Sequence, residues 1–357
     1  MTFEVDLPRL TLVPAMLDRL AADAKRCSKY AGEAFDFDFG PGKINSAIGR
    51  HAETRAAVTG FFDGVARKAA QLSTSIDKSV SDYENVDLAI AADWDARLPQ
   101  IGCVPDSRYD SLRTDLPQVN MREREEPSKH LVAPPDYRPE WPNEPTWTDL
   151  LSPSNICREV VMGVNWLGVR IGVAERVYDP FDALCLPYIG NWAGLRACSD
   201  ALGNLSEACE ALSRNSGWAE TRVNAIWRGN AADAAWLQLK ELTDSLAQAV
   251  PTLTHFMKAY HEVVDEVAEL EKLAEVLMGE LIDAAVFAIL AAATAETVVG
   301  AALFGAATIV KVYRAVRLLD EFITKAGLLE GVVDAFQGKF DSYGVLQIDF
   351  AGAGRLA

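Results

Sequence analysis

Histidines and paired carboxylates are the side chains that most often carry metal or acid–base chemistry, and their spacing in this sequence favours neither. The histidines are His51, His130, His255 and His261. No cysteine or carboxylate stands where it would complete a zinc site with them, so we expect a surface role. Acidic pairs such as Glu123 with Glu126, or Glu269 with Glu271, indicate solvated charge. Without a phosphate loop or a Gly-x-Ser-x-Gly motif, we expect no enzyme, no metal site and no cofactor.

Six cysteines are scattered along the chain without a Cys-x-x-Cys pair: Cys27, Cys103, Cys157, Cys185, Cys198 and Cys209. This is the spacing of neither a metal ribbon nor a dense disulfide framework. Cys198 and Cys209 fall three turns apart on one predicted helix, roughly 16 Å, which is too far for a disulfide. We expect free thiols, made in a reducing cytoplasm.

The composition indicates a folded protein of two or three modules. The chain has 357 residues, half of them apolar and 24% charged, with a formal charge of -17. Such a charge repels nucleic-acid phosphates, so we expect no nucleic-acid partner. The first residues lack a basic region followed by an apolar run, so no cleavable export signal is expected and any export takes another route.

Residues 10–87 predict a helical hairpin. Apolar residues recur every three or four positions over residues 10–34 and again over residues 43–87, the spacing of one helix face. Between them, Gly40, Pro41 and Gly42 favour a sharp turn that follows Phe39. We place this first domain at residues 1–90.

Residues 91–153 form a proline-rich connector in which long helices are not expected. Its Trp94, Trp141 and Trp147 favour segments that lie against the bundle, because an exposed tryptophan loses apolar burial.

Residues 154–279 predict a second hairpin. A short helix at residues 154–173 and an apolar stripe from Trp192 to Leu212 precede a turn region expected at residues 214–229. A long helix follows, with twelve apolar residues spaced three or four apart from Leu239 to Leu277, and Pro251 should kink it without ending it. We expect no strand except for a short extended piece at residues 342–350.

Residues 280–357 begin with an apolar stretch, 281–310, that Glu296 divides into two runs. Each run is shorter than the ~20 residues of a membrane-spanning helix, so a buried helical hairpin that shields the bundle end is expected. The alternative is insertion into a target membrane, since Gly300 and Gly305 permit close helix contact. Together these patterns predict an all-α protein, an elongated four-helix bundle of two hairpins with a connector and a C-terminal apolar segment.

The segment Ile226-Trp-Arg-Gly-Asn-Ala-Ala-Asp-Ala-Ala-Trp236, set between two amphipathic helices, resembles the Trp-x-Gly turn of the WXG (Esx) superfamily of actinobacterial type VII (ESX) secretion substrates. The first hairpin is similar to the EspC-like or PE-like partner half, and Tyr83-Glu-Asn-Val-Asp87 fits the family's Tyr-x-x-x-Asp/Glu secretion motif. Phe39 and Gly40 stand where the other half has Trp-x-Gly. The layout is similar to EspB-like and PE/PPE proteins.

The resemblance implies a virulence-associated substrate or effector of a type VII system, exported folded, secreted or bound to the cell envelope. It implies that the secretion ATPase reads Tyr83, Asp87, Trp227 and Gly229 at one composite end, with other WXG-type proteins or a toxin as further partners. The structural interpretation assigns these residues no recognition role: Trp227 fills the end of the bundle, and Gly229 allows a positive φ angle. The alternatives are a cytoplasmic partner or chaperone of a type VII toxin, and a membrane-disrupting effector that acts through residues 281–310.

Overall fold

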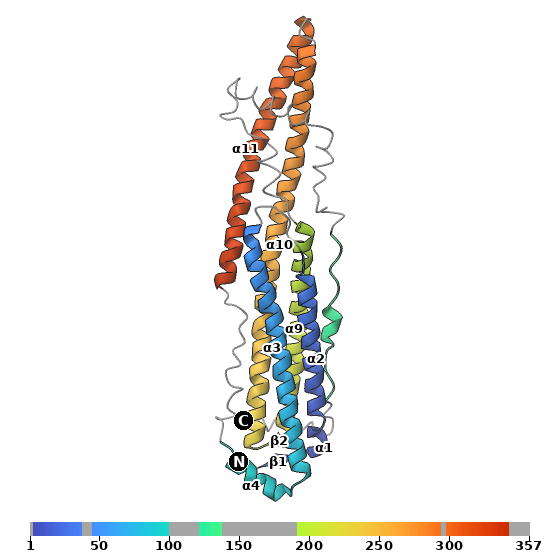
Figure 1. Ribbon diagram of the computed structural model, residues 1–357, viewed down its shortest axis with the longest axis vertical. Helices are drawn as coiled ribbons and strands as arrows, with labels where there is room; N and C mark the ends of the chain where they lie inside the picture. The colour runs from blue at the N-terminus through green and yellow to red at the C-terminus, as the bar shows by residue number, and fades with distance from the viewer. Residues whose placement is uncertain (1–2, 38–44, 100–120, 138–190, 294–297, 343–357) are drawn as a thin grey trace.

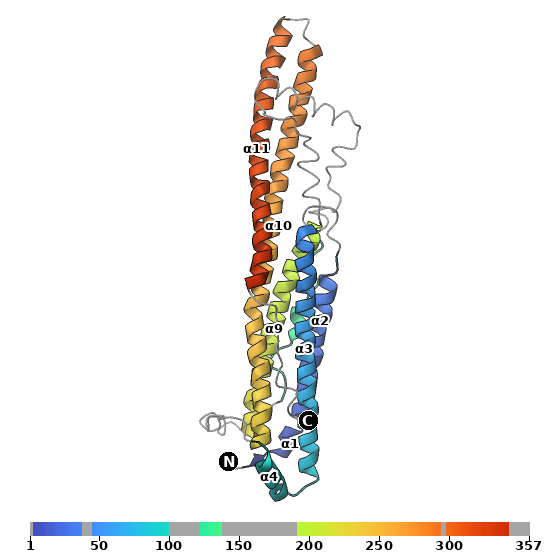
Figure 2. The same ribbon diagram turned by 60° about the vertical axis from the view of Figure 1, so that its left-hand side comes forward.

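The computed structural model describes residues 3–37, 45–99, 121–137, 191–293 and 298–342, and most of these are helical, which confirms the all-α class. Figures 1 and 2 show an elongated molecule whose long helices run along its axis. Several expected features lie outside the described residues: the turn with Phe39 and Gly40, the helix at 154–173, Trp141, Trp147, Glu296 and nearly all of the piece at 342–350.

The N-terminal segment comprises β1 (Glu4–Val5), α1 (Leu7–Leu10), α2 (Val13–Ala34) and α3 (Asn45–Glu84). Asp6 caps α1 by accepting a hydrogen bond from the Arg9 backbone N–H. Helix α2 buries Leu17, Leu20 and Ala24 at helical spacing. It lies antiparallel to α3, as the predicted first hairpin requires (Figure 1).

Helix α4 (Leu88–Arg97) is a short helix that crosses the start of the connector, where only long helices were not expected. Asp87 caps it by accepting a hydrogen bond from the Ala89 N–H at 2.8 Å. Trp94 is 50% exposed, against the expectation that it packs on the bundle. The short helix forms because a capped, proline-free stretch precedes the proline-rich part.

Residues 121–137, named the strap, include the 3-10 helix η2 (Pro127–His130) and lie along α2 and α9. The amide of Asn215 accepts from the Arg124 and Glu125 N–H groups at 3.1 Å and donates to the Glu125 carbonyl at 2.9 Å. Further along, the Tyr30 hydroxyl donates to the Val132 carbonyl at 2.6 Å. Part of the connector therefore does lie against the helices, held by hydrogen bonds to its backbone, by ion pairs and by the buried Met121.

Helix α9 (Trp192–Ile226) runs straight through residues 214–226, so the turn region predicted there is wrong except for its last three residues. Tertiary contacts explain the difference. Asn215 binds the strap, and the hydroxyl groups of Ser216 and Thr243 lie 2.9 Å apart across the contact with α10. Gly217 lies beside Thr243, so small residues that favour a turn in isolation permit close packing here.

Helix α10 (Asn230–Ala293) follows β2 (Trp227–Arg228) and contains Pro251 without ending there, as predicted. It is continuous across residue 280, where the sequence pattern changes. Most of its predicted stripe is buried, including Leu239, Leu253 and Tyr260. The two strands pair antiparallel, a feature not expected from the sequence.

Helix α11 (Val298–Ser342) runs antiparallel to the last part of α10. The two helices extend well past the upper ends of α2, α3 and α9 (Figures 1 and 2). They were expected to shield this end, but they project beyond it instead. Residues 277–293 of α10 and 298–316 of α11 are called the projecting pair below. None of the described helices combines the length and the apolar character needed to cross a membrane.

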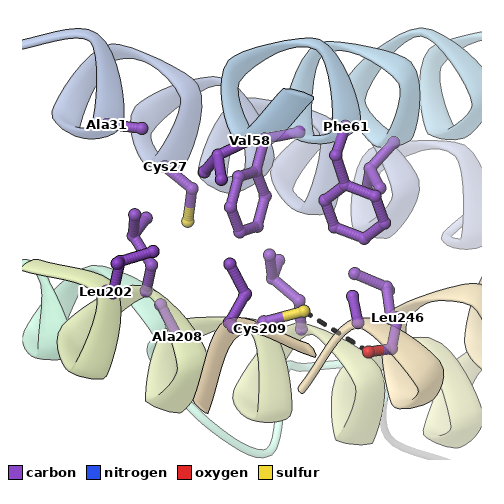
Figure 3. Packing of buried hydrophobic residues seen from close by; sticks show 14 of the residues in the cluster. Cys27, Ala31, Val58, Phe61, Leu202, Ala208, Cys209 and Leu246 are labelled. Atoms are coloured by element: carbon purple, nitrogen blue, oxygen red, sulfur yellow. Dashed lines mark hydrogen bonds between the residues drawn. The ribbon is translucent and has the colours of Figure 1, made fainter. Parts of the chain in front are cut away.

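The main core lies where α2 and α3 meet α9 and α10. Figure 3 shows Cys27 and Val58 facing Leu202 and Cys209 across this contact. Leu202 and Leu212 have no exposed surface. Burial of this kind stabilises by roughly 1.5–3 kcal/mol for each large aliphatic side chain.

Candidate functional site

The end of the molecule formed by β1, β2 and α4, called the lower end, brings together the first residues of the chain and the Trp-x-Gly turn (Figure 1). Val5 pairs with Trp227 and Glu4 with Arg228. The Asp6 N–H donates to the Ile226 carbonyl at 2.7 Å, which satisfies a carbonyl at the end of α9. The turn is thus fixed from outside by the N-terminal strand.

The Tyr83 and Trp227 rings, predicted to share one end, meet edge to face with their centroids 6.0 Å apart. Phe3 packs on the other side of Tyr83 at 5.5 Å. Trp227 is 2% exposed, whereas Tyr83 is half-buried. Burial raises the pKa of Tyr83 to about 12. Tyr83 therefore stays a neutral phenol that reaches the surface.

Gly229 has a φ of +134°, a conformation that favours glycine. A Cβ at this position would collide with the carboxylate of Asp95. That carboxylate accepts hydrogen bonds from the Asn230 and Ala231 N–H groups, each at 2.8 Å, and so caps α10. Position 229 therefore requires glycine for two reasons: its φ angle is positive, and the Asp95 side chain of α4 lies too close to leave room for a Cβ.

Asp95 is the functional-site residue that the sequence reasoning missed. It is 6% exposed, and its backbone carbonyl accepts from the Asn230 side chain at 2.8 Å. The predicted acidic residue, Asp87, is exposed and caps α4 instead. Asp95 lies one helix length beyond the Tyr-x-x-x-Asp motif. Its position in the sequence does not predict a role at this site, because its hydrogen-bond partner Asn230 lies 135 residues further along the chain.

Comparison of the chain with family models, curated proteins and solved structures finds no match. The resemblance to the WXG superfamily therefore depends on the residues themselves. Of the four proposed recognition residues, Tyr83, Trp227 and Gly229 share the lower end, with Tyr83 touching Trp227 and Gly229 following it in the turn. Asp87 lies at the same end, at the start of α4.

A groove of about 750 Å³ opens beside this turn between α3 and α10. Its apolar lining includes Leu72, Ile76, Leu98 and Trp227. Lys68, at its rim, is almost buried and is bound by the side chains of α10 at Gln238 and Glu241. The groove is large enough for a short peptide segment or a few side chains of a partner.

A second polar cluster lies near the other end of α3, and it corrects the expectation of surface histidines. His51 is 6% exposed; its Nδ1 lies 2.8 Å from the Tyr260 hydroxyl and its Nε2 lies 3.0 Å from the Phe35 carbonyl. A carbonyl can only accept, so Nε2 carries the proton and Tyr260 donates to Nδ1. Burial lowers the pKa of His51, and the neutral ring joins the two helix pairs.

Among the cysteines of the described ranges, Cys27, Cys198 and Cys209 are free and buried, as expected; Cys103, Cys157 and Cys185 lie outside these ranges. Burial raises the pKa of Cys27 to about 12, so its thiol stays protonated. The Cys209 thiol donates to the Leu246 carbonyl at 3.4 Å (Figure 3). The part of the chain that the structure describes contains no group of three metal-ligating side chains.

Proposed function

We propose that this chain is a substrate or secretion-associated effector of a type VII secretion system, exported as a folded, elongated four-helix bundle of two hairpins. The observation that supports this best is the edge-to-face contact of Tyr83 with Trp227, 6.0 Å between centroids. In the superfamily that the sequence resembles, two such residues belong to two hairpins that together present the export signal.

Pairing within one chain supports a secretion unit that needs no separate partner hairpin. A pair of amphipathic helices cannot cover both of its apolar stripes, and here α2 packs on α9. A covalent connection makes this pairing intramolecular, at a high effective concentration. The strap adds hydrogen bonds from both pairs, through Tyr30 of α2 and Asn204 of α9, to the Val132 carbonyl.

In this proposal the secretion ATPase reads the lower end. Tyr83 supplies a half-buried aromatic edge, and Asp87 supplies an exposed carboxylate at the start of α4. Trp227 and Gly229 hold the turn in the shape against which Tyr83 packs. Binding is by surface complementarity, with no covalent chemistry.

The test is the fraction of the protein that reaches the culture medium in a host with a type VII system. We expect Tyr83→Ala and Asp87→Ala to abolish export, with unchanged helical circular dichroism and with the protein retained in the cytosol. Tyr313→Ala, at an exposed tyrosine of the projecting pair, is the matched control and should export normally. Retention of the wild type together with all variants would instead favour a cytoplasmic partner of a type VII toxin.

Membrane contact is a second candidate function, favoured by the exposed apolar side chains of the projecting pair. Ile309, Val310 and Tyr313 are each more than half exposed on α11. If these residues enter a bilayer, Ile309→Asp combined with Val310→Asp should reduce dye release from liposomes, because buried charge opposes insertion. Release that is the same for both proteins would exclude this function for α11.

A further inference from the structure

Helix α4 turns large apolar side chains outward at the lower end. Ile90, Trp94 and Leu98 are 49%, 50% and 45% exposed. They recur every fourth residue and so lie along one side of the helix, with Leu98 as the residue that follows its last turn. The buried residues of α4 are Ala91 and Asp95. The helix is therefore held mainly by the hydrogen bonds of Asp95 to α10, and its own large side chains remain available.

This arrangement is typical of a helix that is recognised rather than one that is packed. Apolar residues of an amphipathic helix normally face the core, and a helix that presents such residues at a four-residue spacing fits a groove on another protein. Tryptophan is among the residues that most often carry the binding energy of interfaces. Trp94 lies in the middle of this row.

The charge around the row selects the kind of partner. Asp82, Glu84, Asp87 and Asp93 are exposed around the start of α4 or on it. The basic residue of α4, Arg97, is ion-paired with Asp93. A second copy of this acidic end, or an anionic membrane, would bring like charges together. A protein groove with an apolar floor and basic residues at its rim is complementary.

The row also continues into the groove beside the Trp-x-Gly turn. Leu98 lines that groove together with Trp227, Ala231 and Ala235. A partner that covers Ile90 and Trp94 therefore reaches the proposed recognition residues without crossing a polar gap at Leu98. Leu98 therefore joins the outward side of α4 to the apolar part of the groove, whose lining also includes polar residues such as Gln71 and Lys78.

We propose that Ile90, Trp94 and Leu98 of α4 form the docking surface for a partner protein that carries an apolar groove with a basic rim. This inference rests on the proposed function, in which the partner is the type VII secretion ATPase. Tyr83 and Trp227 then shape the signal, and α4 provides the anchoring side chains.

The experiment measures the Kd of the full chain for the purified cytosolic region of the host's type VII secretion ATPase. The docking variant combines Ile90→Ala, Trp94→Ala and Leu98→Ala. Its matched control combines Ile309→Ala, Val310→Ala and Tyr313→Ala, three apolar residues of α11 that are somewhat more exposed than those of the row. We expect the docking variant to raise Kd at least about thirtyfold and the control to leave it unchanged. Glu84→Lys should also raise Kd, most strongly at low salt.

Each other result overturns the inference in a different way. A wild type that binds, with a docking variant that binds equally well, removes α4 from the interface but leaves the proposed function intact. A wild type that does not bind the ATPase removes both. Sedimentation velocity and vesicles of phosphatidylglycerol test the other occupants: self-association or vesicle binding that the docking variant abolishes would assign α4 to a second copy or to lipid.

Discussion

The part of the molecule where α2, α3, α9 and residues 230–267 of α10 pack together differs sharply from the projecting pair. In the packed part, Leu205, Leu212 and Leu242 have no exposed surface. In the projecting pair, Ile309 and Val310 are more than half exposed. Both regions are helical, and the projecting pair is the more apolar of the two in sequence, so neither helix formation nor apolar content by itself specifies how many neighbours a helix has.

Among the side chains that the structure describes, the projecting pair is held by buried apolar residues and by ion pairs. Ala284 and Val312 are buried between the two helices. Lys311 lies 2.9 Å from Glu280 and 2.8 Å from Asp283. The Lys311–Asp283 pair is partly exposed and contributes little to stability, and two helices alone cannot cover all of their apolar surface, so the projecting pair should depend on the packed part to remain folded.

The largest effect is expected from a cavity in the packed part. Leu212→Ala should lower the free energy of unfolding by about 2–5 kcal/mol, because the side chain is fully buried and its removal leaves a void. Urea unfolding followed by circular dichroism measures this. Ile309→Ala is the matched control and should change the value by less than about 0.5 kcal/mol. Equal losses for the two variants would mean that the two regions do not differ in packing.

A smaller effect is expected from the cap of α10 at the lower end. Asp95→Ala should lower the free energy of unfolding by about 1–2 kcal/mol, because two N–H groups lose their acceptor. Hydrogen exchange at Asn230 and Ala231 should also become faster. Asp93→Ala, two residues earlier and exposed, serves as the control. Unchanged exchange in Asp95→Ala would show that the cap does not hold this end.

The pH dependence of stability should originate in the packed part. The pKa of His51 is lowered in the folded state, so below its ordinary value of about 6.5 the unfolded chain binds the proton first. Stability should therefore fall as pH falls through this range, by at most about 1.4 kcal/mol per pH unit. Unfolding measured between pH 7.5 and 5.5 tests this. His51→Gln should flatten the slope, whereas His130→Gln, on the strap, should not.

The smallest effect is expected at the exposed contact between α10 and α11 just outside the projecting pair. Lys325→Ala removes the ion pair with Glu269 at 2.9 Å, both side chains of which are solvent-accessible. The thermal midpoint should move less than in any variant above, and the small difference should vanish in 1 M salt because exposed charges are screened. A midpoint shift as large as that of Asp95→Ala would show that ion pairs hold this region.

The sequence predicted the elements whose partners follow from periodicity. The helices of the first hairpin, the long stripe of α10 and the meeting of Tyr83 with Trp227 could all be predicted, because apolar spacing and antiparallel packing determine them. The helical state of residues 215–217 could not, since the strap binds Asn215 and Thr243 of α10 contacts Ser216 and Gly217. The role of Asp95 was hidden for the same reason: its hydrogen-bond partners lie on a distant segment.

The sequence reasoning also misjudged side chains whose burial depends on the third dimension. His51 was expected on the surface, but Tyr260 of α10 and the Phe35 carbonyl surround it. Trp94 was expected to pack, but α4 needs only Ala91 and Asp95 to dock. In both cases the expected burial followed the usual behaviour of the residue type, and a particular tertiary contact produced the opposite burial.

The contact of α2 with α9 has a consequence for synthesis on the ribosome. Helix α3 ends at Glu84, and the helix that covers the first pair begins only at Trp192. At ordinary elongation rates the intervening chain takes roughly 5–20 seconds to appear. During that interval the apolar sides of the nascent α2 and α3 have no intramolecular cover from α9 or α10, so a holding chaperone would find its binding site in the first quarter of this chain.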